Sequence, residues 1–284
     1  MNSLGEDRDA GGHRSPESAA PVVLTIAGSD SGGGAGVQAD LKTFAAFGCF
    51  GASAITCLTA QNPDEVAGIE AVSPEMAALQ IETVCKGFPV AAAKTGMLYS
   101  ADLIRAVAKA IRKAQLPFLC VDPVMVSTSG ARLLREDAVE TLCTDLISLA
   151  AVTTPNLPEA EMLCGHAIAS VEEMHAAARE IGRKFGVSCA LKGGHLGNGR
   201  SEGGGDTVSD VLYHEGNTIE EAFPRVRARE THGTGCVFSA ALTACVARGD
   251  DLPTAFRTAR LFVAEALARP LSAGRHFPLG IRPR

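Results

Sequence analysis

From residue 22 onward, short apolar runs alternate with stretches in which apolar residues recur every three or four positions. The short runs predict strands, and the periodic stretches predict helices. The expected strands cover residues 22–27, 50–60, 90–93, 118–121, 151–153, 187–191 and 208–213. The expected helices cover residues 37–45, 74–84, 103–111, 138–149, 158–163, 171–185, 236–247 and 253–268. This alternation indicates an α/β fold in which a mostly parallel sheet carries helices on both faces.

The length and composition of the chain are compatible with one large folded unit. It has 284 residues, of which 46% are hydrophobic, so it can bury a sizeable core. Neither an internal repeat nor a linker divides it, and we expect a single domain over residues 21–270. Residues 1–20 are polar, Gly-rich and mixed in charge, which predicts a disordered tail, and residues 271–284 are expected to form a second tail.

Charge and cysteine content exclude several classes of partner. The formal net charge of −6 argues against a nucleic-acid-binding surface. The nine cysteines are odd in number and include no Cys-x-x-Cys pair, which is typical of a reduced, intracellular chain without structural zinc. An apolar leader and an uninterrupted apolar run of about 18 residues are both missing from the sequence. We therefore expect a cytoplasmic protein that acts on a small molecule.

The sequence THGTGC at residues 231–236 carries the most chemical information. A turn through Gly233, Thr234 and Gly235 at the start of a predicted helix can direct several backbone N–H groups at one anion. Cys236 falls in the first turn of that helix, where a thiolate is stabilised. Together these features indicate group transfer, most simply of phosphoryl. The alternative is a helix start that needs glycine for its backbone geometry and cysteine for packing.

Polar residues follow most of the expected strands. In open α/β sheets, ligands bind beyond the carboxyl ends of the strands, so we expect these side chains to converge at one edge. They are Asp30, Gln61, Lys94, Asp122, Asn156, Glu159 and Lys192.

A nucleoside triphosphate would need an unusual phosphate site in this chain. The Walker A pattern is absent, because no Gly-Lys pair occurs, and residues 233–236 are the natural replacement. Asp122 and Glu159 are candidate Mg²⁺ ligands, directly or through water, and Lys192 can approach phosphate oxygens. For Glu159 the alternative is an acid that is favoured at a helix N-terminus by the dipole.

A second group of residues can recognise a heteroaromatic ring. Asp40 lies early in the first predicted helix, and Gln61 offers both a donor and an acceptor, so the pair can read an amino group and ring nitrogens. Met97 and Val124 can pack on the faces of such a ring. Alternatively, Met97 and Val124 are ordinary core residues.

A competing motif lies in the first Gly-rich turn. Residues 34–39 read GAGVQA, which matches the dinucleotide-binding pattern G-x-G-x-x-G/A and makes a nicotinamide-dependent oxidoreductase a rival interpretation. Two details count against it. The pattern starts several residues beyond the strand, and Gln61-Asn62 stands where an acid should close the second strand. Farther along, the Gly-rich residues 193–205 are either a lid over the site or a long disordered loop.

Seven motifs occur in an order that resembles a known family. They are VVLTIAGSDSGGGAGVQAD at 22–40, LTAQN at 58–62, KTGML at 94–98, VDPVM at 121–125, TPNLPEA at 154–160, LKGGHL at 191–196 and THGTGC at 231–236. Over about residues 22–270 the chain resembles the hydroxymethylpyrimidine/phosphomethylpyrimidine kinases of the ribokinase-like superfamily. The resemblance implies a three-layer αβα fold, a homodimer, and an ATP- and Mg²⁺-dependent kinase of thiamine biosynthesis. Such an enzyme phosphorylates 4-amino-5-hydroxymethyl-2-methylpyrimidine on its hydroxymethyl group and then phosphorylates that monophosphate.

The resemblance also implies a role for each matching residue. Asp40 and Gln61 would bind the pyrimidine, in a pocket lined by Gly28, Met97 and Val124. Asn156 and Glu159 would organise Mg²⁺ and phosphate, and Asp122 would assist in binding the metal. Lys192 and Arg260 would contact the nucleotide, and Gly233, Thr234 and Gly235 would form an anion hole. Cys236 would occupy the position at which sugar kinases of the superfamily have an aspartate base.

Two departures from the family pattern affect the nucleotide contacts. Residues 127–130 read STSG where many relatives have Ala-Lys-Ser-Gly, and Arg260 stands close to a place where many have lysine. A free thiol has a pKa of about 8.5, so we expect only a minor thiolate fraction of Cys236 at neutral pH, which the helix N-terminus and nearby cations can increase. We expect the anion hole and Mg²⁺ to supply most of the rate, while Cys236 orients or deprotonates the hydroxyl.

Three rival functions remain open at this point. A pyridoxal kinase has the same fold and chemistry, and the pyridoxal aldehyde can react reversibly with Cys236. An enzyme that acts on both the pyrimidine and pyridoxal is therefore a further possibility. The oxidoreductase belongs to a different class. The third rival is a binding protein without catalytic activity. The presence of Cys236, Asp122 and Glu159 argues against it.

Overall fold

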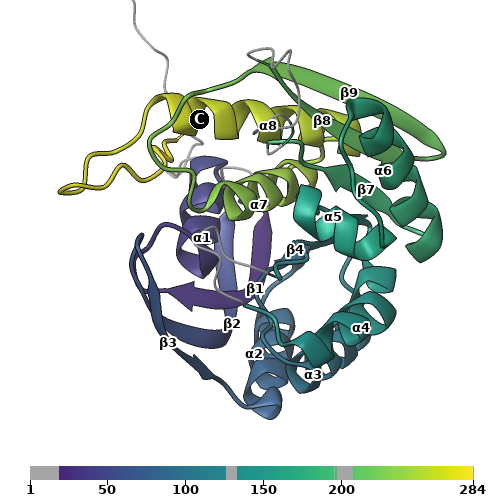
Figure 1. Ribbon diagram of the computed structural model, residues 1–284. Coiled ribbons are helices and arrows are strands. Elements are labelled where there is room, and N and C mark those ends of the chain that lie inside the picture. The colour runs from purple at the N-terminus through teal and green to yellow at the C-terminus, as the bar shows by residue number, and fades with distance from the viewer. Residues whose placement is uncertain (1–18, 126–132, 195, 197–206, 284) are drawn as a thin grey trace, which may run out of the picture.

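The computed structural model describes residues 19–125, 133–194, 196 and 207–283, which form one sheet between two layers of helices (Figure 1). The sheet has nine strands in the order β3-β2-β1-β4-β5-β6-β7-β8-β9. Their bounds are β1 (Val22–Asp30), β2 (Phe50–Gln61), β3 (Val66–Ala71), β4 (Val90–Thr95), β5 (Leu119–Val121), β6 (Val152–Thr153), β7 (Ser188–Leu191), β8 (Thr207–His214) and β9 (Asn217–Pro224). The expected α/β architecture with a mostly parallel sheet is confirmed.

The parallel part of the sheet runs from β2 through β1 to β7, and its edges are antiparallel. Leu24 pairs with Ala52 of β2 and with Ala93 of β4, both in parallel register. β3 pairs with β2, β8 pairs with β7, and β9 pairs with β8, all in antiparallel register. The parallel strands β1, β2, β4, β5, β6 and β7 therefore bring their carboxyl ends to the same edge of the sheet.

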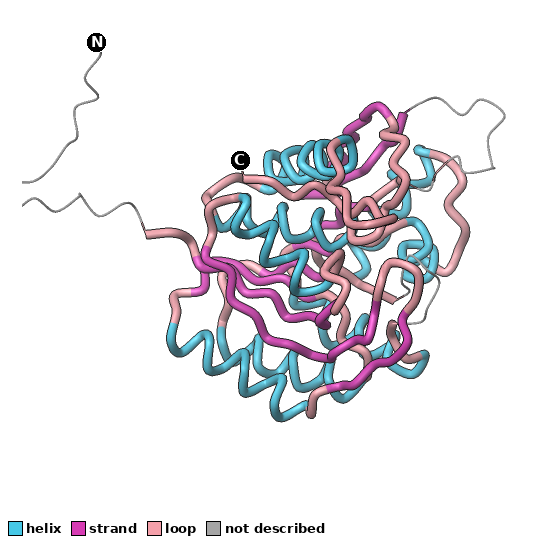
Figure 2. Tube along the Cα trace, turned by 90° about the vertical axis from the view of Figure 1, so that its left-hand side faces the viewer, coloured by secondary structure: helices cyan, strands magenta, loops and turns pink. Residues whose placement is uncertain are grey.

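Helices cover both faces of this sheet (Figure 2). One core lies under α2 (Pro74–Gly87), α3 (Ala101–Ala114), α5 (Leu157–Cys164) and α6 (Val171–Phe185), and the other under α1 (Gly36–Ala46), α7 (Thr234–Ala247) and α8 (Leu252–Ala268). Along β1, Leu24 and Ile26 point into the first core and Val23 into the second, as the twofold alternation of a strand requires. The apolar runs in the sequence are continuous because both faces are buried.

One expected helix is irregular. The segment predicted as a helix over residues 138–149 consists of a 3-10 turn at Glu136–Ala138, α4 (Val139–Thr141), a π turn at Leu142–Leu146 and a 3-10 turn at Ile147–Leu149. Leu142, Leu146 and Ile147 are all buried in the core under α3.

The end of the chain is not the detached tail that we expected. The Gly280 amide donates to the Ala266 carbonyl at 3.0 Å, and Leu279 is buried among the α8 side chains. Arg275 forms an ion pair with Asp64. The folded unit thus includes residues beyond 270, while the expected N-terminal tail lies almost wholly outside the described residues.

None of the helices in the described part of the chain combines the length and the apolar character that a membrane span needs.

Candidate active site

A cavity of about 550 Å³ opens at the carboxyl ends of the parallel strands, beside the N-terminus of α7. Its volume falls in the usual range for small-molecule sites. The expected site residues that line it are Gly28, Gln61, Met97, Asp122, Val124, Asn156, Glu159, Lys192, Gly233, Thr234, Gly235, Cys236 and Arg260. The convergence inferred from strand ends is therefore observed for every expected residue except Lys94, which is fully buried and does not line the cavity. Met97 and Val124 face the cavity.

Asp40 is the exception among the expected pyrimidine-binding residues. Its side chain is fully buried in α1, where one carboxylate oxygen lies 3.0 Å from Lys94 Nζ and the other accepts from the Thr25 hydroxyl at 2.6 Å. Burial alone would lower the pKa of Lys94, but Asp40 and other nearby groups raise it above its ordinary value, so the ammonium stays charged. Asp40 supports the structure beneath the cavity and does not line it.

The two Gly-rich turns of the sequence lie against each other at the cavity. Gly233 has a φ of +86°, and a Cβ atom at this position would lie 1.9 Å from the Gly34 carbonyl oxygen. Both the left-handed conformation and the close approach require glycine. Gly36 has a φ of +56°, and a Cβ there would lie 2.4 Å from the Gly28 oxygen. The glycines that resembled a dinucleotide fingerprint thus allow backbone packing between β1 and α1.

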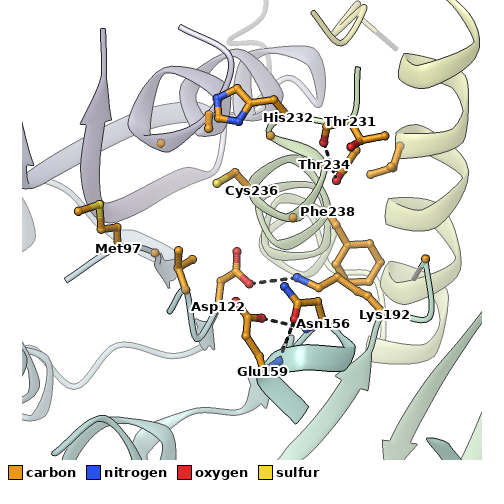
Figure 3. A pocket seen from close by; sticks show the side chains of 18 of the residues that line it. Met97, Asp122, Asn156, Glu159, Lys192, Thr231, His232, Thr234, Cys236 and Phe238 are labelled. Atoms are coloured by element: carbon orange, nitrogen blue, oxygen red, sulfur yellow. Dashed lines mark hydrogen bonds and ion pairs between the residues drawn. The ribbon is translucent and has the colours of Figure 1, made fainter. Parts of the chain in front are cut away.

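The N-terminus of α7 meets a lysine at the centre of the cavity. A Cβ at Gly235 would lie 3.3 Å from Lys192 Nζ, so the ammonium sits directly beside the first turn of the helix. Unsatisfied backbone N–H groups and an ammonium together form a site for an anionic group. Figure 3 shows Lys192 and Phe238 on one side of Cys236 and Asp122, and Met97 on the other.

Asp122 is held by a buried hydrogen-bond network. One of its oxygens accepts from Lys192 Nζ at 3.2 Å and from the Thr154 hydroxyl at 3.1 Å, and the other accepts from the Ser239 hydroxyl at 3.1 Å. Burial alone would raise its pKa, but the ammonium groups of Lys192 and Lys94 hold the pKa of Asp122 below the ordinary value. Asp122 is therefore ionised at neutral pH.

Asn156 and Glu159 form a capping box at the start of α5. The Asn156 side chain accepts from the Glu159 amide, and the Glu159 carboxylate accepts from the Asn156 amide, both at 2.9 Å. The helix-terminal role that we considered for Glu159 is present, yet the side chain also lines the cavity. Burial raises its pKa to about 7; Lys192 opposes the shift, and Asp122 adds to it. A cation near both carboxylates would relieve this repulsion.

The charge state of Cys236 is set by its burial. Burial raises the pKa of its thiol to about 11; Lys94 lowers it, whereas Asp40 and Asp122 raise it. Cys236 is therefore a neutral thiol at physiological pH, which is consistent with the minor thiolate fraction that we expect for it.

Arg260 lies at the far end of the cavity, on α8. Its Nε is 2.8 Å from an Asp210 oxygen, and the other oxygen of Asp210 accepts from the Gly193 amide at 2.7 Å. The Arg260 guanidinium also lies over the Phe223 ring. Arg260 therefore joins α8 to β8 and to the residue that follows Lys192.

Sequence reasoning missed His232 and left Asp30 without a role. The His232 Nε2 atom lies 3.0 Å from Asp30 Oδ2 and 3.3 Å from the Gln61 amide nitrogen. Asp30 also accepts from the amides of Gly32 and Ala35, both at 2.8 Å. The only signal in the sequence was the position of His232 within THGTGC.

Two sequence interpretations fall largely outside the described residues. They are the lid or loop at residues 193–205 and the STSG departure at residues 127–130.

A family model described as phosphomethylpyrimidine kinase matches residues 30–279. The chain belongs to the phosphomethylpyrimidine kinase family. Hydroxymethylpyrimidine/phosphomethylpyrimidine kinase of Haemophilus influenzae is 44% identical over 252 residues, which are 89% of this chain and 93% of that protein. Thiamine biosynthesis bifunctional protein ThiED of Geobacter sulfurreducens is 44% identical over 259 residues, and the match spans 90% of this chain and 51% of that longer protein.

A solved structure shares the fold closely. Bacillus subtilis pyridoxal kinase in complex with ADP gives a TM-score of 0.82 at 34% identity, covering 92% of this chain and 97% of its own. Membership of the phosphomethylpyrimidine kinase family confirms the resemblance, the ribokinase-like fold and the class of enzyme, a phosphotransferase. The oxidoreductase interpretation of residues 34–39 is therefore wrong.

Proposed function

We propose that this protein transfers the γ-phosphoryl group of ATP to the hydroxymethyl group of 4-amino-5-hydroxymethyl-2-methylpyrimidine, and then phosphorylates the resulting monophosphate in thiamine biosynthesis. The observation that carries the proposal is the placement of an anion site between two ends of one cavity. The Lys192 ammonium, which reaches from the side of Phe238 to Asp122, and the first turn of α7 lie between Met97 at one end and the Phe238 ring at the other (Figure 3). A phosphoryl group held there can pass from a donor at one end to an acceptor at the other.

The Met97 end suits a small amino-substituted ring. Met97 and Val124 offer apolar surface for its faces, and the Gln61 carboxamide offers a donor and an acceptor for its edge. A Cβ at Gly28 would lie 2.7 Å from Cys57 Sγ and 3.3 Å from Met97 Sδ, so no side chain fits at this position. The bare backbone of Gly28 leaves room for a flat ligand beside Met97.

The other end suits the base of a nucleotide. It is lined by apolar side chains from β8, α7 and α8, with Arg260 among them. Those that form this apolar surface are Val208, Val226, Phe238, Val263 and Leu267. Lys192 lies on the route from this surface to the centre of the cavity, where the phosphates would lie.

Asp122 and Glu159 fit the requirements of Mg²⁺, which prefers oxygen ligands and one or two protein carboxylates. Both carboxylates border the cavity, and their repulsion contributes to the raised pKa of Glu159. When bound, Mg²⁺ neutralises charge on the transferred phosphate. Lys192 stabilises the same charge from the side of the α7 terminus.

The neutral thiol of Cys236 orients the hydroxyl of the substrate in this proposal. Phosphoryl transfer passes through a loose transition state, so little nucleophilic assistance is needed before the new bond forms. The backbone N–H groups of Gly235 and Cys236 stabilise the oxygens of the transferred group, whereas that of Thr234 donates to the Thr231 carbonyl. The positions of Lys192 and Gly235 then matter more to the rate than a strong base.

Pyridoxal kinase activity is the second candidate, alone or beside the first. It is supported by the likeness to the pyridoxal kinase whose structure holds ADP. Pyridoxal also has a ring nitrogen and a hydroxymethyl group, so the Met97 end can accept it.

The test is ADP release from Mg-ATP, measured with the hydroxymethylpyrimidine, its monophosphate and pyridoxal in parallel. We expect turnover of both pyrimidines and its loss in Lys192→Ala, with Lys184→Ala on α6 as the matched lysine control. Turnover of pyridoxal alone would reject the main proposal in favour of the second. Silence with all three, from folded protein, would reject both. A homodimer and a cytoplasmic location stay predictions. Size-exclusion chromatography with light scattering tests the first, and cell fractionation tests the second.

A further inference from the structure

His232 connects the two Gly-rich turns at the pyrimidine end of the cavity. Its side chain is about one-fifth exposed, whereas Asp30, its ion-pair partner, is buried. A Cβ at Gly34 would lie 2.8 Å from the imidazole Cδ2, so the ring packs directly on the first turn. The ring therefore has a fixed position with Nε2 between Asp30 and Gln61.

The contact with Asp30 fixes the proton on this ring. Asp30 accepts backbone hydrogen bonds, and the favourable partner of its carboxylate is an N–H group. Because Asp30 Oδ2 lies 3.0 Å from Nε2, Nε2 must carry a proton and donate it. The other neighbour of Nε2, the Gln61 side chain, consequently faces a donor.

The second neighbour of the Gln61 carboxamide is Thr59. The Thr59 hydroxyl donates to the Ser29 carbonyl at 2.9 Å, which uses its single hydrogen. Gln61 Oε1 lies 3.2 Å from this hydroxyl oxygen, and Gln61 Nε2 lies 3.3 Å from His232 Nε2. The Thr59 hydroxyl hydrogen points to Ser29, and the His232 Nε2 hydrogen points to Asp30. In this orientation the Gln61 oxygen therefore faces the Thr59 oxygen, which is an acceptor, and the Gln61 NH₂ group faces the His232 N–H, which is a donor. A half turn of the carboxamide exchanges its oxygen and nitrogen. The nitrogen then donates to the Thr59 hydroxyl oxygen, and the oxygen faces the His232 N–H and shares the hydrogen that Nε2 donates to Asp30.

We propose that His232 is a positioning residue that locks the Gln61 carboxamide with its oxygen toward the imidazole and its nitrogen toward Thr59. The inference rests on the proposed function, because it concerns how Gln61 reads the pyrimidine. One N–H and one lone pair of the carboxamide remain for the ligand. They match a ligand that places its ring nitrogen on the Thr59 side and its amino group on the His232 side. In the same pose they mismatch the inverse pattern, a ring N–H beside a carbonyl. His232 thereby determines specificity through the orientation of the Gln61 carboxamide.

The test compares the 4-amino substrate with its 4-oxo analogue, which presents the inverse pattern. Wild-type protein is expected to favour the amino compound by at least roughly 100-fold in kcat/KM, because the oxo compound leaves two polar groups mismatched. In His232→Ala the carboxamide can turn, and we expect this ratio to fall at least tenfold, mainly through KM. His232→Gln can still donate to Asp30 and is expected to retain most of the ratio.

The matched control is His175→Ala on α6. His175 is similarly exposed and lies 3.3 Å from the Glu220 carboxylate, so it also pairs with an acid. Its removal is expected to leave the ratio unchanged. Equal losses for both substrates in His232→Ala, with the ratio preserved, would mean a purely structural role and would overturn the inference.

A measurement without substrate separates this inference from the proposed function. Long-range ¹H–¹⁵N correlation spectra of wild-type protein are expected to show a proton on His232 Nε2. An unprotonated Nε2 would overturn the lock whichever substrate the enzyme takes. Absence of turnover with either pyrimidine would reject the proposed function, while the spectra would still decide the state of His232.

Discussion

Asp40 and Lys94 form an ion pair at 3.0 Å in which neither side chain is exposed to solvent. Breaking such a pair leaves one charge buried without its partner. We predict that Asp40→Asn and Lys94→Met each lower the free energy of unfolding by about 3–5 kcal/mol. Urea denaturation followed by circular dichroism measures these losses.

The double variant Asp40→Asn/Lys94→Met distinguishes this role from substrate contact. Because the second change removes the charge that the first left unpaired, the double variant should lose much less stability than the sum of the two single losses. A stable Asp40→Asn protein with only a raised KM for the pyrimidine would instead restore Asp40 to the binding site.

Substitutions at Gly235 and Cys236 compare how much the anion site and the thiol each contribute to kcat. Gly235→Ala would bring a methyl group to 3.3 Å from Lys192 Nζ and displace the ammonium from the α7 terminus. We predict a fall in kcat of roughly 100-fold for Gly235→Ala, comparable to the loss of one oxyanion donor, and a much smaller fall for Cys236→Ala. Steady-state kinetics with saturating Mg-ATP give both values. A far larger loss in Cys236→Ala would show that the thiol takes the proton.

Gly233 and Gly249 both have positive φ values but differ in their surroundings. A Cβ at Gly233 meets the Gly34 oxygen at 1.9 Å, whereas Gly249, with a φ of +99°, has nothing within 4 Å. Gly249→Ala should therefore cost only the strain of the left-handed conformation, roughly 1 kcal/mol. Gly233→Ala should also separate the two Gly-rich turns and abolish most activity. Thermal unfolding and kcat of the two variants test this, and equal effects would contradict it.

Glu159 is predicted to make stability fall as pH rises. Its pKa is raised to about 7 in the folded protein, mainly by burial, whereas an unfolded glutamate titrates near 4.5. Between these values the folded state retains a proton that the unfolded state has released, so each rise in pH favours unfolding. The loss is complete above about pH 7 and amounts to roughly 3 kcal/mol.

The variant Glu159→Gln keeps an acceptor for the Asn156 amide but cannot ionise. We expect its free energy of unfolding to lack the decrease that Glu159 causes between pH 5 and pH 8. Urea unfolding at each pH measures this free energy. Glu140→Gln, at an exposed site on α4, should keep the wild-type dependence. An unchanged decline in Glu159→Gln would show that another group is responsible.

The parallel strands could be predicted because both faces of the sheet are buried, which makes each strand a continuous apolar run. β3 and β9 were missed for the opposite reason. β3 reads VAGIEA and β9 reads NTIEEAFP, and most of their side chains are partly or fully exposed. Antiparallel strands at the edges of a sheet can be polar on one face, so they lack the apolar signal.

The lining of the cavity could be predicted from strand ends, but not the partner of each polar group. Asp40 was misplaced because its position early in a helix does not reveal whether it faces the cavity or the sheet. His232 was missed because its role depends on Asp30, which is 202 positions away in the chain. The pKa of Cys236 depends on burial, which no local motif reports.

The layer formed by α1, α7 and α8 has a consequence for synthesis of the chain. Val23 and Phe44 lie in the first part of the sequence, while Val237 and Phe256, buried in the same core, come from the last two helices. A nascent chain on the ribosome must therefore expose one apolar face of its central strands until α7 and α8 have been synthesised. Chains that stop before α7 should be substrates for chaperones and proteases rather than smaller folded domains.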